Sequence, residues 1–145
     1  MNTICILLPG IWAGLLVGVS FIATPAKFWA PSLSLPVALD IGRTTFAIWN
    51  NVEWLLLAVL ALATLEAKAS LFPLAAAGAL NLLLLIQSMI LLPGLNKRAD
   101  AIIGGANLAP SSDHATYIAI DFFKLGILTA LIWKYGEQIM SLGLH

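Results

Sequence analysis

Charged residues are scarce in this chain, and long basic runs are absent. Only 10% of its 145 residues are Asp, Glu, Lys or Arg, whereas 61% are hydrophobic. A soluble domain carries about 25% charged residues, so the composition excludes an ordinary soluble globular protein. The formal net charge is zero. With no cluster of Lys and Arg, we expect neither nucleic-acid binding nor a polybasic lipid switch.

Residues for metal, redox and hydrolytic chemistry are also few. The single cysteine, Cys5, excludes an intramolecular disulfide and a multi-cysteine metal site. No His-x-x-His or Glu-x-x-His spacing supports a metal site at His114, Asp121 and Glu53, and His114 is too shallow for a haem ligand. P-loop, dinucleotide-binding and nucleophile-elbow motifs are absent. The adjacent Ser, Asp and His of "SSDH" cannot line up as a triad. We therefore expect no metal, haem or other cofactor.

Long apolar runs are what the chain does have. They predict helices at about 4–24, 36–66, 70–95 and 113–135, with a loop at 96–112. No Lys or Arg precedes the first run, which favours a retained helix over a secretory signal. The predicted fold class is all-α: a single domain, 1–145, forming an integral membrane bundle of four transmembrane helices. A bacterial inner membrane is the expected location.

An even number of spans places both termini on one side of the membrane. The loop side would hold Lys27, Lys97 and Arg98, with Arg43 added if it lies at the interface, and the terminal side Lys68 and Lys134. The positive-inside rule then predicts a cytoplasmic loop 96–113 and termini outside.

Small residues recur at four-residue spacing in the first helix, at Gly10, Gly14 and Gly18. Such a face allows close approach of another membrane helix. We favour packing inside the bundle over packing against a second copy, which leaves a homodimer as an alternative.

Polar side chains interrupt three of the four apolar runs at a shared depth. Counting 1.5 Å per residue from the loop side places five of them roughly 10–15 Å inside the membrane. They are Glu53 in the second helix, Gln87 and Ser88 in the third, and Asp121 and Lys124 in the fourth, and Asn50 and Asn51 lie just before Glu53 in the same span. Because polar groups are costly in lipid, we expect them to face one another or a wet cavity.

Each polar set also lies on one face of its helix. On an ideal helix, His114, Tyr117, Asp121 and Lys124 fall within an arc of roughly 80°. The second helix has a wider stripe, and its members are Asp40, Arg43, Asn50 and Glu53, with Asn51 at its margin.

Ion pairs within single helices can neutralise all but one of these acidic side chains. Asp121 with Lys124, and Asp40 with Arg43, are i, i+3 partners that can neutralise each other. Glu53 has no such partner on its own helix, so it would share Lys124, hold a proton or meet a cation. Glu53 is therefore the leading candidate for a functional residue.

Two interpretations of this polar layer stay open. The string from His114 inward has the spacing of a proton relay, but the ion pairs would equally serve as static clasps between helices. The amides Asn50, Asn51 and Gln87 would in that case form ordinary interhelical hydrogen bonds.

Three functional hypotheses follow. The first is binding or transport of protons, or of a small polar or cationic ligand, in a pocket in the loop half, with Glu53 and Asp121 as binding groups. The second is an accessory or assembly subunit of a larger membrane complex. The third is a membrane-embedded enzyme with Glu53 and Asp121 as acid and base, and non-enzymatic roles are preferred to it.

Overall fold

The computed structural model describes residues 3–109 and 111–143, and every regular element within them is helical. Several of these elements join end to end into longer helices. In chain order the elements are α1 (Thr3–Leu16), η1 (Val17–Ala23), α2 (Thr24–Trp29), α3 (Leu35–Glu66), α4 (Leu71–Ile86), η2 (Gln87–Leu91), α5 (Leu92–Ile103) and α6 (Asp113–Gly143). The two η segments are π-helical.

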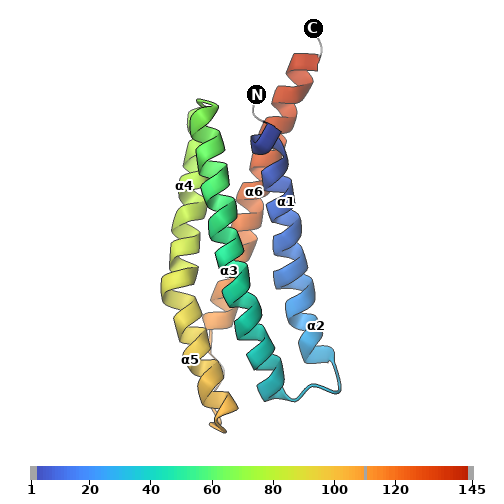
Figure 1. Cartoon of the computed structure of the whole chain (residues 1–145), viewed down its shortest axis with the longest axis vertical. Coiled ribbons are helices and arrows are strands. Elements are labelled where there is room, and N and C mark those ends of the chain that lie inside the picture. The colour runs from blue at the N-terminus through green and yellow to red at the C-terminus, as the bar shows by residue number, and fades with distance from the viewer. Residues whose placement is uncertain (1–2, 110, 144–145) are drawn as a thin grey trace.

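The helices form a four-membered ring. Contacts join α1 to α3, α3 to α4, α4 to α6 and α6 back to α1. Successive long helices run in opposite directions, so both described ends of the chain lie at the same end of the bundle (Figure 1). We call the opposite end, which holds residues 30–34, 104–109 and 111–112, the loop end. In this ring α3 and α6 are a diagonal pair, and long side chains between them meet on the bundle axis.

Two helices continue through a proline and end later than the sequence predicts. The expected ends were 24 and 95, but α2 continues to Trp29 and α5 to Ile103. Residues 96–103 of the predicted loop 96–112 are thus helical. A proline ring pushes against the carbonyl four residues before it. For Pro25 and Pro93 that carbonyl lies inside η1 and η2, and the wider π-helical turn lets each helix continue past its proline.

The last helix also runs beyond its predicted end at 135, to Gly143. The prediction followed apolarity, which declines after Trp133. Glu137 and Gln138 are nevertheless good helix formers, so the helix persists without an apolar sequence.

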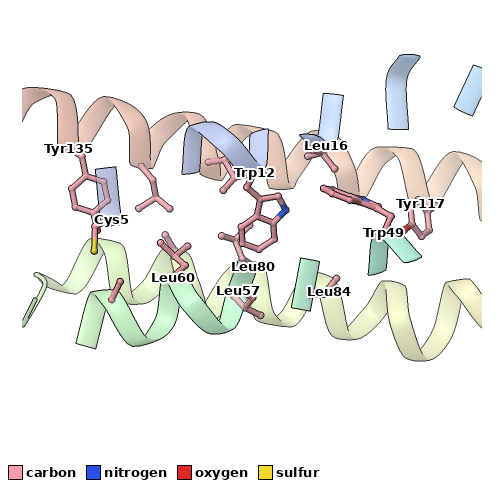
Figure 2. Close-up of a cluster of buried hydrophobic side chains, with 14 of the residues drawn as sticks. Cys5, Trp12, Leu16, Trp49, Leu57, Leu60, Leu80, Leu84, Tyr117 and Tyr135 are labelled. Atoms are coloured by element: carbon pink, nitrogen blue, oxygen red, sulfur yellow. The ribbon is translucent and has the colours of Figure 1, made fainter. Parts of the chain in front are cut away.

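The interior is filled by large apolar and aromatic side chains (Figure 2). Trp12, Leu60, Leu80 and Leu128 are fully buried. The outer surface is apolar as well, with Leu55, Leu62, Leu71, Phe123 and Trp133 more than half exposed. Within the described residues, four helices are long and apolar enough to cross a membrane: Thr3–Trp29, Leu35–Glu66, Leu71–Ile103 and Asp113–Ser141.

The glycine face of α1 and η1 does not pack inside the bundle. A Cβ atom built at Gly10, Gly14 or Gly18 meets nothing within 4 Å. Our preference for internal packing of this face was therefore wrong. The opposite face, which carries Trp12 and Leu16, turns to the interior, because burying those larger side chains removes more apolar surface.

Candidate functional site

Three charged side chains meet on the bundle axis. The Lys124 ammonium lies 2.6 Å from Glu53 Oε1 and 2.9 Å from Asp121 Oδ1. All three side chains are 0% exposed. Glu53 comes from α3 and the other two from α6, so the ion pairs cross the diagonal of the ring. We call Glu53, Asp121 and Lys124 the buried charge cluster.

Two uncharged donors complete the first layer around the cluster. Gln87, at the start of η2, donates its side-chain N–H to Asp121 Oδ1 at 2.8 Å and to the backbone carbonyl of Tyr117 at 3.2 Å. Trp12 of α1 donates its indole N–H to Glu53 Oε1 at 3.2 Å. All four long helices therefore contribute to one polar centre, which restricts their register and rotation.

The cluster has one acid in excess and free acceptor positions. Two carboxyl groups face one ammonium, so one negative charge is unbalanced if all three groups are ionised. In the part of the chain that the structure describes, no hydrogen-bond partner reaches Glu53 Oε2, Asp121 Oδ2 or Gln87 Oε1. Each carboxyl group thus has one oxygen on the ammonium and one oxygen available to hold a proton.

Among the described residues, no side-chain hydrogen bond or ion pair links His114 or Tyr117 to the buried charge cluster. Tyr117 is buried, and its ring packs edge-on against Phe46 at 5.0 Å between centroids. Its link to the cluster is the backbone carbonyl that accepts from Gln87. His114 is exposed at the start of α6.

Asp40 and Arg43 belong to a separate, exposed ion-pair group near the loop end. Arg43 Nε lies 2.7 Å from Asp40 Oδ1, and its Nη1 also pairs with Asp100 of α5. The sequence reading missed Asp100 because it placed residue 100 in a loop. The i, i+3 spacing did predict the Asp40–Arg43 pair.

Asn50 lies in a second polar contact between α3 and η2. Ser88 donates its hydroxyl to Asn50 Oδ1 at 2.6 Å or to the carbonyl of Leu84 at 2.7 Å, and it accepts the indole N–H of Trp54 at 3.1 Å. Asn51 is exposed on another face of α3.

Trp12 is the residue of the polar centre that sequence reasoning missed. Tryptophan in an apolar helix is commonly a belt residue at the membrane surface, so its type alone does not indicate a role in a polar centre. Trp12 nevertheless lies nine residues beyond Thr3, roughly 14 Å along the helix, which is too deep for a belt. Applying the depth count to aromatic donors as well as to charges would have found it.

Two cavities lie nearer the loop end. The first, of about 80 Å³, lies among α2, α3, α5 and the start of α6, and its wall includes Lys27, Arg43 and His114. The second, of about 340 Å³, lies between η1–α2 and α6, and its wall includes Ser20, Phe21 and Ile118. Among the described residues, no group of three or more His, Cys, Asp or Glu side chains is placed to hold a metal ion.

Comparisons of the chain with protein-family models, with curated proteins and with solved structures give no match. The geometry therefore defines a class by architecture alone: a bundle of four apolar helices around a buried, charged centre.

Proposed function

We propose that this chain is an integral membrane protein of bacterial inner-membrane type whose buried charge cluster binds and releases one proton. The apolar outer surface supports the membrane location, because exposed leucines and phenylalanines over most of a bundle suit lipid rather than water. Ionisable groups inside such a span are costly and usually serve transport or proton transfer.

The observation that carries the proposal is the position of one ammonium between two carboxyl groups. Lys124 balances one of them, and the second carboxyl group requires one more positive charge. A proton is the ligand that fits side chains with no exposed surface, because it needs no space of its own. Glu53 Oε2 and Asp121 Oδ2 are the unpartnered atoms that would carry it.

Protein side chains determine where this proton resides. Trp12 and Lys124 both donate to Glu53 Oε1, while Asp121 Oδ1 accepts from Gln87 and forms an ion pair with Lys124. The two carboxyl groups therefore have matched surroundings of one ammonium and one neutral donor. A proton shared between such similar sites would move between them on small changes in helix position.

The cytoplasmic placement of residues 96–113 remains part of this proposal.

Infrared spectroscopy of the purified protein in lipid nanodiscs tests the assignment. We expect a protonated-carboxyl band that shifts in heavy water and disappears in both Glu53→Gln and Asp121→Asn. The exposed acid Asp40 supplies the matched control, and Asp40→Asn should leave the band intact. A spectrum without any such band over the whole pH range in which the protein stays folded would refute proton binding by the cluster.

The open glycine face of α1 and η1 favours a second candidate role, assembly with another membrane helix, which both an accessory subunit and a homodimer require. Gly10, Gly14 and Gly18 leave a strip of backbone accessible to another helix. A second copy of the chain is the simplest occupant. Light scattering of the detergent-solubilised protein should then show a dimer that Gly14→Leu dissociates, whereas a wild-type monomer would remove self-association from consideration.

A further inference from the structure

The two cavities near the loop end are neighbours, because Thr24, Phe28 and His114 line both of them. The larger arm, about 340 Å³, has the size of small-ligand pockets in general. We call the two cavities together the interfacial groove. It runs from the cationic wall near Lys27 towards Ser20, between η1–α2 and the first turns of α6.

The cationic arm contains an ammonium without a counterion. Lys27 is half-buried, and its Nζ lies 5.2 Å from the centre of the Phe28 ring and 5.5 Å from that of Phe46. No carboxylate of the described residues lies within 4.0 Å of it. Gly42 provides the space, because a Cβ at that position would overlap Lys27 Nζ. A cation held partly out of water beside a cavity favours an anionic ligand.

The apolar arm contains an unsatisfied hydroxyl. Ser20 is 5% exposed and lines this arm, and its Oγ has no hydrogen-bond partner among residues 3–109 and 111–143. Buried polar groups normally have partners. A hydroxyl in this position would donate to a carbonyl oxygen of a bound molecule. The rest of the arm is apolar, with Phe21, Trp29 and Ile118 in its wall.

We propose that the interfacial groove binds one anionic phospholipid. Its phosphate would lie against Lys27 and His114, an ester carbonyl would accept from Ser20, and an acyl chain would follow Phe21 and Ile118. The groove thus combines a cation, a hydroxyl donor and an apolar wall, which are the groups that a phosphate, an ester and an acyl chain require. Ser20 lies seven residues before Lys27, roughly 10 Å along the helix. The inference rests on the proposed membrane location but not on proton binding.

Arg43 is not assigned to the phosphate although it lines the same cavity. Its guanidinium is already paired with Asp40 and Asp100. Lys27 is thus the cation whose loss should matter most. Lys97, an exposed lysine on α5, provides a control with the same change of charge.

The test measures lipid binding to the delipidated protein by native mass spectrometry. We expect dioleoylphosphatidylglycerol to bind with a 1:1 stoichiometry and dioleoylphosphatidylcholine to bind much more weakly. Lys27→Gln should weaken the phosphatidylglycerol complex roughly tenfold, equivalent to about 1.4 kcal/mol, and Lys97→Gln should leave it unchanged. Equal binding of the two lipids, or equal loss in both lysine variants, would overturn the proposal.

Two further measurements test the ester and the phosphate of the lipid individually. Wild type should prefer the diester form of phosphatidylglycerol over the diether form by roughly threefold, the value of a neutral hydrogen bond, and Ser20→Ala should remove that preference. Inorganic phosphate should not displace phosphatidylglycerol when it is added at the concentration at which the lipid saturates the protein. If phosphate alone displaced the lipid, the occupant would be a free anion and the lipid assignment would be wrong.

Gly42→Ala provides a second test of Lys27 that can be used if Lys27→Gln does not fold. The added methyl group displaces the Lys27 amine while the positive charge stays in the protein. We expect weaker phosphatidylglycerol binding in this variant too, and unchanged binding would refute the role of Lys27. The carboxyl band of the buried charge cluster should persist in all groove variants, so loss of lipid binding and loss of proton binding are distinguishable.

Discussion

Removing Lys124 should be far more damaging than removing Glu53, although each substitution breaks the same ion pair. At an effective dielectric constant of about 20, each contact of the ammonium, at 2.6 Å and 2.9 Å, is worth about 6 kcal/mol of Coulombic attraction. Desolvation of each buried ion costs several kcal/mol and offsets most of this gain. The net effect of a variant therefore depends on what it leaves behind.

Lys124→Met loses both attractions and leaves two buried carboxyl groups without a cation. Protonation of those groups limits the penalty, and we expect a loss of about 3–5 kcal/mol in the free energy of unfolding. Glu53→Gln leaves Lys124 and Asp121 as a balanced pair and removes the excess acid, so its expected effect is within about 1 kcal/mol of zero. In the double variant, Glu53→Gln should recover part of the stability lost in Lys124→Met.

Unfolding by sodium dodecyl sulfate in mixed micelles, followed by circular dichroism, measures these differences. Lys134→Met removes an exposed ammonium of α6 that is paired with Glu137, and it should cost less than about 1 kcal/mol. The reasoning fails if Glu53→Gln destabilises as much as Lys124→Met. That result would mean that the second carboxylate is required rather than in excess.

Three smaller changes probe the surroundings of the cluster. Trp12→Phe keeps the ring but removes the donor to Glu53, and it should cost about 1–3 kcal/mol; in the Glu53→Gln background the same micelle titration should show a smaller cost. Ser88→Ala removes an interhelical hydrogen bond and should cost about 0.6 kcal/mol, so a loss above about 2 kcal/mol would contradict its minor role. Phe46→Ala opens the aromatic layer beside Tyr117 and should speed hydrogen–deuterium exchange of the protonated-carboxyl band, whereas an unchanged rate would place the route of proton exchange elsewhere.

The polar centre was predictable because two geometric rules act together in an apolar helix. Counting depth placed Glu53, Gln87 and Asp121 at a common level, and counting faces placed Asp121 and Lys124 on one stripe. The structure brings these four side chains together. Sharing of Lys124 by both acids was one of three options from the sequence. The choice among them depends on whether the Lys124 side chain can span the distance from α6 to α3. Counting residues along one helix gives no information about that distance.

The rest was not predictable from apolarity and spacing. Pro25 and Pro93 are normally helix terminators, and only a local π-helical turn lets a helix pass them. This extension placed Asp100 on a helix, where it reaches Arg43. The outward orientation of Gly14 depended on competition with Trp12 for the interior, which is decided by packing of the whole bundle.

The polar groups of the bundle form successive layers from the loop end inward. Nearest the loop end, Arg43 pairs with acids in exposed positions, and Lys27 lies at the same cavity without an acid partner among the described residues. Then Phe46 and Tyr117 stack edge to face, with the Lys27 ammonium on one side and the Asp121 partner Gln87 on the other. A proton entering from this end would have to pass the aromatic pair. Under the proposed function, movement of those rings, rather than chemistry at the carboxyl groups, would limit the rate of exchange from the loop end.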